Sequence, residues 1–304
     1  MPAGAATERA IFPLWSRSEQ LRGLFDYIDA QVGAGSPLRL AGFDNQASGT
    51  LSRDSLTHDL GTFLRENGVD PTSWDEWPDF VAGVRVFAAQ GFRPGGASAD
   101  SVQTFVELAR EALDRIEAVK SDRADATFWS LVVRGAVTRL TPGSPETRDA
   151  AMARNLTWLV RDRFPEEKII VWAASSRIMA ASDAIEELDG FVSMGSLVRE
   201  AWEHAPFIIG FTALEGDILD VSNGGVLPLS EPAIGSLEEI WSGTQHDVAF
   251  LPLRDLQPAV RWLDEPMVAR PLGYREVEAV WPRHFDAIVF TRVMEPSRIA
   301  PPRF

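Results

Sequence analysis

The chain has 304 residues, of which 45% are hydrophobic and 10% aromatic, so it can bury a large core. Its formal net charge of −15 argues against nucleic acid as a partner, because phosphate backbones bind positive surfaces. We attribute the acidity to solubility rather than to an acidic docking surface. The absence of cysteine excludes disulfides, thiolate metal sites and a cysteine nucleophile.

The sequence indicates no contact with a membrane. No apolar run reaches the ~18–20 residues that span a bilayer. The first residues lack the basic and apolar regions of a signal peptide. We therefore expect a cytoplasmic protein.

The N-terminal part predicts a helix followed by a short strand. The helix covers 18–32, where apolar residues recur at helical spacing: Leu21, Leu24, Phe25 and Ile28. The strand covers 38–44 and finishes on Asp44, and the polar run that follows it is typical of a loop at the carboxyl end of a sheet strand.

The middle third predicts helices and no strand. These helices cover 56–64, 77–89, 100–119 and 145–164, and the last has Ser144 as its expected N-cap. We therefore predict an all-helical insertion, or cap, over approximately 54–165, placed between two strands of a sheet.

The stretch 168–183, KIIVWAASSRIMAASD, predicts a buried strand that leads into a small-residue turn and a helix start. Ile169 to Trp172 are β-branched and aromatic residues, as in a strand covered on both faces. Further strands are predicted at 207–214, 247–253, 267–271 and 287–293, with a short helix at 236–241. The expected fold is α/β, with a mostly parallel central sheet flanked by helices, in a single domain over 1–304.

Several common catalytic motifs are absent. The sequence contains no GxSxG elbow, no GxxxxGK[ST] or GxGxxG loop and no HExxH pair. Its four histidines are not spaced as metal ligands, and we interpret them as surface or supporting residues. We expect neither a metal nor a cofactor.

Polar residues follow successive predicted strands, and the carboxyl ends of such strands are where ligands usually bind. The candidate catalytic groups are Asp44, Arg177 and Glu215, which we expect around one cleft. The candidate substrate-binding residues are Gln46, Ser175, Ser176, Trp74 and Trp77. Two alternatives remain open: the carboxylates could simply cap turns, and the tryptophans could pack in the core.

Taken together, several segments resemble the erythromycin esterase family. Its features appear in register over most of the chain: FPLWSRSEQLRGLFDYI at 12–28, PLRLAGFDNQASG at 37–49, TRDAAMARNLTWL at 147–159, KIIVWAASSRIM at 168–179, SMGSLVREAWEHAPFIIGFTALEGD at 193–217 and HFDAIVF at 284–290. The resemblance implies an α/β fold with a helical insertion, and hydrolysis of ester or lactone bonds, as in macrolide inactivation and antibiotic resistance. The family's proposed mechanism is a histidine-activated water assisted by acidic groups.

Two departures from the family pattern bear on activity. The family opens on a GExxHGxxE motif that supplies the proposed base, and this sequence begins after it. The family's WAHNxH run corresponds to 172–177, where Ala174 and Arg177 occupy both histidine positions. A guanidinium stays charged near neutral pH, so Arg177 can bind an anion or stabilise an oxyanion but cannot act as a base.

Three interpretations follow. The chain is a hydrolase homologue acting on a small-molecule ester or lactone, with a second chain supplying the missing N-terminal strand. Alternatively, it is a non-catalytic ligand-binding or partner subunit that kept the scaffold. The third is a truncated reading frame with an exposed sheet edge. The substitutions at 174 and 177 favour inactivity of the chain by itself.

Overall fold

The computed structural model of the protein describes residues 3–35, 38–47, 49–119, 123–220, 224–254 and 262–302. The chain divides into two compact units, the first formed by residues 1–167 with 298–304 and the second by residues 168–297. Within the described residues, no helix has the length and apolarity needed to cross a membrane. The expectation of one domain over 1–304 stays a prediction.

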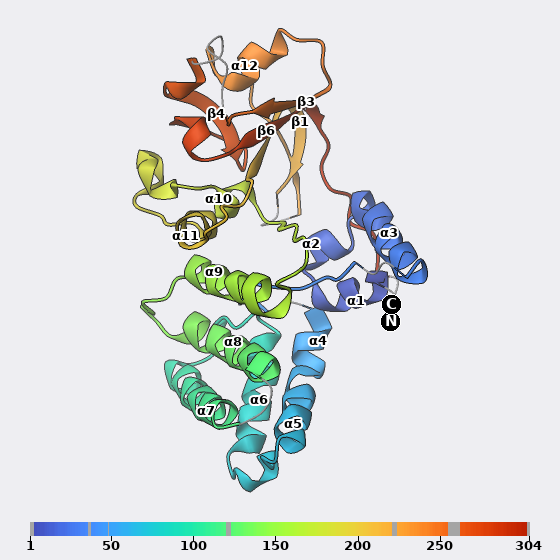
Figure 1. Ribbon diagram of the computed structural model, residues 1–304, viewed down its shortest axis with the longest axis vertical. Helices are drawn as coiled ribbons and strands as arrows, with labels where there is room; N and C mark the ends of the chain where they lie inside the picture. Colours follow the sequence, from blue (N-terminus) through green and yellow to red (C-terminus); the bar gives the residue numbers. More distant parts are fainter. Residues whose placement is uncertain are drawn as a thin grey trace. The chain divides into compact units, whose positions relative to one another are not determined.

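The first unit is built from helices. Helix α8 packs between α7 and α9 (Figure 1). Short 3-10 turns lie at Glu19–Leu21 and Pro71–Ser73. The α-helices are α1 (Ala3–Ala10), α2 (Pro13–Ser16), α3 (Arg22–Gly33), α4 (Gly49–Asp54), α5 (Leu56–Glu66), α6 (Trp77–Ala88), α7 (Ala99–Glu117), α8 (Arg123–Leu140) and α9 (Arg148–Trp158). The described part of 54–165 contains helices and no strand, and the sequence pattern did not predict α8; that this block is an insertion or cap stays a prediction.

The core of the first unit centres on Phe105 of α7. Its ring lies 4.9 Å from that of Phe87 and 6.0 Å from that of Phe80, measured between centroids. Gly83 of α6 faces this ring, and a Cβ at Gly83 would lie 2.3 Å from it. α6 and α7 therefore pack closely because position 83 has no side chain.

Helix α9 begins later than predicted. Its N-cap is Thr147, whose Oγ1 accepts a hydrogen bond of 3.1 Å from the Ala150 amide, so the expected cap at Ser144 is wrong. The helix continues as a π-helical turn over Leu159–Arg163. Ser144 and Thr147 are both short polar residues suited to capping a helix, so the sequence alone did not show which of them is the N-cap. The hydrogen bond from the Ala150 amide to Thr147 Oγ1 identifies Thr147.

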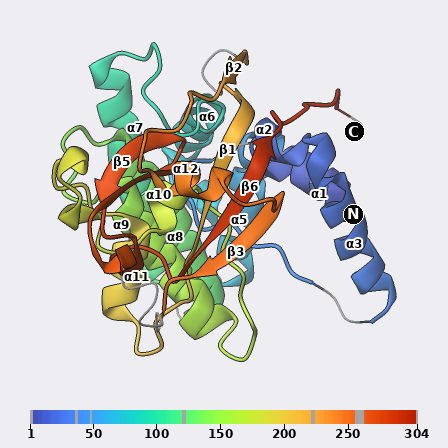
Figure 2. The same cartoon turned by 90° about the horizontal axis from the view of Figure 1, so that it is seen from above.

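The second unit contains a four-stranded sheet in the order β2-β1-β6-β3 (Figure 2). Strands β4 and β5 form a separate antiparallel pair. Its strands are β1 (Ile209–Leu219), β2 (Val226–Pro228), β3 (Val248–Pro252), β4 (Met267–Leu272), β5 (Arg275–Ala279) and β6 (Ala287–Met294). Its helices are α10 (Ser175–Ile178), α11 (Met194–Ala201) and α12 (Leu237–Ser242), with 3-10 turns at Ser182–Ala184, Glu186–Leu188 and Trp281–Arg283. The predicted strands at 207–214, 247–253, 267–271 and 287–293 are confirmed.

The α/β class is confirmed, but the sheet is mixed rather than mostly parallel. Only the β1–β6 pair is parallel among the three pairs of the four-stranded sheet. One face of the sheet is buried: Ile288 and Phe290 of β6 are fully buried, and Trp241 of α12 stacks on Phe290 at 4.9 Å. The second unit thus has a hydrophobic core of its own.

Two predicted strands are not strands in the structure. Residues 38–44 and 168–174 have no regular secondary structure. In the second segment, Ile170 is 95% exposed and Trp172 is 55% exposed, so the expected burial on both faces is wrong. A β-branched run gives strand propensity, but a strand forms only where a neighbour pairs with it, and no described strand pairs with either segment. The helical block therefore does not lie between two sheet strands.

Candidate functional site

In the first unit, the loop after residue 43 is held by helix α9. Two nitrogens on one edge of the Arg148 guanidinium donate to the Asp44 carboxylate: Nε donates to Oδ1 at 3.0 Å, and the terminal nitrogen Nη2 donates to Oδ2. The Gln46 amide also donates to Asp44 Oδ1 at 3.0 Å, which closes a turn. A bidentate Arg–carboxylate pair fixes both direction and distance.

A second residue of α9 also binds this loop. Asn155 lies two turns after Arg148, on the same face of the helix, and its Nδ2 donates to the Phe43 carbonyl at 2.9 Å. The helix therefore binds two successive residues of the loop. Arg148 and Asn155 of the RDAAMARN segment thus hold Phe43 and Asp44 of the GFD segment in place.

Two further arginines lie by this loop. Arg93 donates to the Gln46 side chain at 3.4 Å, and Arg139 of α8 donates through Nε to the Gly91 carbonyl at 3.0 Å. Burial lowers the pKa of Arg139, and the charges of Arg148 and Arg93 lower it further. The Asp44 hydrogen bond raises the pKa of Arg148. Sequence reasoning missed these three arginines, and only the RDAAMARN segment gave a signal for one of them.

In the second unit, Ser175, Ser176 and Arg177 form the short helix α10, and all three are half-buried. The Arg177 guanidinium lies over the ring of Phe191, 5.5 Å from its centroid. Glu215 is exposed on β1, opposite Val293 of β6. The small-residue turn predicted here is therefore present, with Arg177 facing an aromatic ring.

The chain just after α10 is fixed by buried polar contacts. The Ser193 hydroxyl, fully buried, donates to the Met179 carbonyl at 2.6 Å and caps α11. His284 Nδ1 pairs with the Ala180 carbonyl at 2.9 Å, and the Ala180 amide donates to the His284 carbonyl at 3.0 Å. Burial lowers the pKa of the His284 imidazole. This histidine therefore tethers the segment that follows Arg177.

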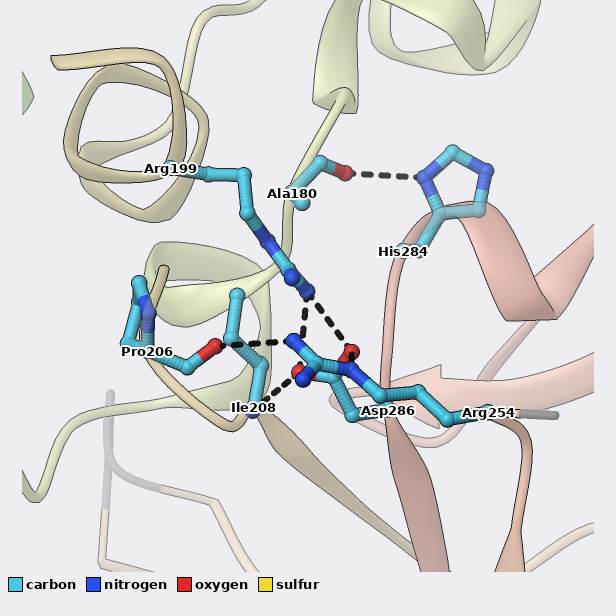
Figure 3. A network of polar contacts seen from close by, with 7 residues as sticks. All are labelled: Ala180, Arg199, Pro206, Ile208, Arg254, His284 and Asp286. Carbon is cyan, nitrogen blue, oxygen red and sulfur yellow. Dashed lines mark hydrogen bonds and ion pairs between the residues drawn. The ribbon is translucent and has the colours of Figure 1, made fainter. Parts of the chain in front are cut away.

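A buried carboxylate lies beside this tether (Figure 3). The Asp286 side chain is 4% exposed and accepts hydrogen bonds from Arg199, Arg254 and the Ile208 amide. The two arginine side chains are 26% and 44% exposed. Asp286 thus joins α11 to the starts of β1 and β6, which is a structural role.

The predicted site residues fall in both units. Asp44 and Gln46 lie together in the first unit, whereas Ser175, Ser176, Arg177 and Glu215 belong to the second. Their convergence on one cleft stays a prediction. Trp74 is 2% exposed and donates to Glu111 at 3.0 Å, so the structure places it in the helical core rather than on a binding surface. Trp77 is half-buried and lies 6.0 Å from Trp74 between ring centroids.

The four histidines differ in burial. His58, His204 and His246 are exposed, and His284 is 2% exposed and engaged with the Ala180 backbone. Among the described residues, no group of three or more His, Asp or Glu side chains is arranged to hold a metal ion. The polar groups assembled around the candidate loops are mainly arginine, carboxylate and amide.

The erythromycin esterase family model matches residues 2–294 of this chain. The chain belongs to the erythromycin esterase family. A curated relative, the putative hydrolase YbfO of Bacillus subtilis (strain 168), is 27% identical over 160 residues. That match covers 50% of this chain and 36% of YbfO, so the chain spans about a third of this relative's length.

Solved structures show the same fold at low identity. A Bacillus cereus protein has a TM-score of 0.70 at 17% identity, with 95% of this chain and 75% of that one covered. A mutant of the erythromycin esterase EreC in its open conformation has a TM-score of 0.64 at 17% identity, with coverages of 89% and 72%. At these identities the structures establish an erythromycin esterase-like fold and nothing about the substrate.

Proposed function

We propose that this protein binds a small-molecule ester or lactone on the scaffold of an erythromycin esterase-type hydrolase, and that the chain alone does not cleave it. The observation that carries this proposal is the side-chain chemistry at 172–177. By the resemblance to the family's WAHNxH run, Ala174 and Arg177 stand at the two histidine positions, and neither side chain can take a proton from water near neutral pH. Without these imidazoles to deprotonate water, ester hydrolysis loses the ~10²–10⁴-fold contribution of general-base catalysis.

The polar residues that remain are suited to binding. Arg177 can bind an oxyanion or a carboxylate through its guanidinium. Gln46 is held beside Asp44 and offers an amide to a polar ligand group. Asp44 is already engaged by Arg148, so its role in this proposal is to orient the loop.

The test is hydrolysis by the purified chain of p-nitrophenyl acetate, p-nitrophenyl butyrate and erythromycin, measured against buffer. We expect no turnover above buffer for any of the three. The control is Arg110→Ala, which removes the same positive charge from an exposed position. If the wild-type chain shows turnover that disappears in Arg177→Ala and persists in Arg110→Ala, the proposal is overturned and Arg177 is a transition-state group.

A second candidate is an active hydrolase completed by another chain. The observation that favours it is the 168–174 segment, whose strand-type side chains are exposed, with Ile170 at 95%. A strand from another chain pairing there would bury them. Light scattering and intact-mass analysis of the protein from its native host test this candidate: a lone 33.5 kDa species contradicts it, and a second polypeptide in a hydrolytically active complex supports it.

A further inference from the structure

Two arginines beside the Asp44 loop have no anionic partner. Arg93 donates to the amide oxygen of Gln46, and Arg139 donates to the carbonyl of Gly91, which are both neutral acceptors. Neither arginine makes an ion pair with any residue that the structure describes. Arg148, in contrast, is neutralised by Asp44. Among the described residues, both guanidinium groups therefore hydrogen-bond only to neutral acceptors, in a protein whose formal net charge is −15.

The two arginines converge on one loop. Gly91 has a φ of 65°, and a Cβ there would lie 3.0 Å from the Ala47 carbonyl oxygen and 3.1 Å from the Gln46 side chain. The turn that carries Gly91 and Arg93 is therefore in direct contact with residues 46–47. Arg139 reaches the same turn from α8. Burial is the main cause that lowers the pKa of Arg139, and the further lowering by the charges of Arg148 and Arg93 agrees with this proximity.

A buried amide at the same place also lacks a partner. Asn45 is 7% exposed, and neither its Oδ1 nor its Nδ2 has a hydrogen-bond partner among the described residues. Helix α8 lies against it, because a Cβ at Gly135 would be 2.9 Å from the Asn45 Cβ. Arg139 follows Gly135 by one helical turn. An unsatisfied buried amide is uncommon in folded proteins, and this one lies next to Gln46 in the loop that the turn with Gly91 and Arg93 contacts.

We propose that Arg93 and Arg139, with Gln46, form a binding site for the phosphate group of a small organic molecule. Arg93, Arg139 and Arg148 together with Asp44 carry a formal charge of +2, which a phosphate dianion balances and a single carboxylate does not. Guanidinium groups match the geometry of phosphate oxygens and bind them through paired N–H donors. The proposal rests on the proposed function for the identity of the ligand as a small molecule, and it adds that this molecule carries phosphate.

Calorimetric titration of the full chain at fixed ionic strength tests this site. The probes are inorganic phosphate, phenyl phosphate and acetate, with sodium chloride balancing the ionic strength because exposed charges are screened by salt. We expect saturable binding of both phosphates, with phenyl phosphate the tighter, and at least tenfold weaker binding of acetate.

Matched variants locate the binding. Arg93→Gln and Arg139→Gln should each weaken phosphate binding about tenfold, whereas Arg110→Gln, an exposed arginine on α7, makes the same charge change and should leave it intact. Arg139→Gln also removes the hydrogen bond to the Gly91 carbonyl, so it can change both phosphate binding and the stability of the turn. Arg93 is exposed, so Arg93→Gln changes phosphate binding without such an effect on folding.

Several results would overturn the proposal. These are no saturable phosphate binding, equal weakening by Arg110→Gln, acetate binding as tightly as phosphate, or phenyl phosphate binding no more tightly than inorganic phosphate. None of them bears on ester hydrolysis, which is read separately with p-nitrophenyl acetate. The phosphate site and the proposed function can therefore fail independently.

Discussion

Gly195 offers a sharp test of how the segment after Arg177 is positioned. This glycine is the second residue of α11 and is buried. A Cβ there would lie 1.9 Å from the Ile178 carbonyl oxygen and 2.5 Å from that of Met179. These are backbone atoms, so no side-chain rotation relieves the clash, and Gly195→Ala must displace the chain that leaves α10.

The magnitude follows from two opposing effects. Alanine in place of glycine in a helix gains up to about 1 kcal/mol. Forcing a methyl group into a packed site loses about 1–3 kcal/mol, and a backbone clash places this case at the upper end. The net destabilisation should be about 2 kcal/mol, which lowers the melting temperature by roughly 4–8 °C.

Gly23 provides the matched control. It also lies in a helix, α3, and a Cβ there would meet no atom within 4 Å. Gly23→Ala should therefore raise the melting temperature slightly, because only the helix-propensity gain remains. The assay is thermal unfolding followed by circular dichroism for both variants. Equal melting temperatures for Gly195→Ala and Gly23→Ala would contradict the close approach of Gly195 to the Ile178 carbonyl oxygen.

Other substitutions test the remaining features. The unfolded chain takes up a proton near pH 6.5 before the buried His284 does, so stability should decline as the pH falls below 6.5, and His284→Asn should lose that part of the pH dependence in denaturant titrations. Asp286→Ala should destabilise by about 3 kcal/mol, since it leaves Arg199 without its carboxylate partner; urea unfolding with an unchanged midpoint would contradict this. Ser193→Ala removes a helix cap and a buried hydrogen bond, and a loss smaller than about 1 kcal/mol in the same assay would argue against both contacts. Ile170→Lys should change stability by less than about 0.5 kcal/mol, and strong destabilisation would mean that this residue is buried as first predicted.

The site was only partly predictable because its contacts join distant parts of the chain. Asp44 and Arg148 are separated by 104 positions, and a sequence shows both residues without showing that one binds the other. Trp74 illustrates a choice that the sequence left open. An aromatic residue in a helical region suits either a ligand surface or a core, and its 2% exposure places it in the core.

The sequence by itself determined the family, the α/β class and most helices, because these depend on local patterns. The face of α7 could be read from its 3.6-residue periodicity, and the late strands from their β-branched runs. Tertiary structure decided whether a strand-like run became a strand. The segments 38–44 and 168–174 carry suitable residues, but strand formation requires a hydrogen-bonding neighbour, and that requirement is not encoded within the run itself.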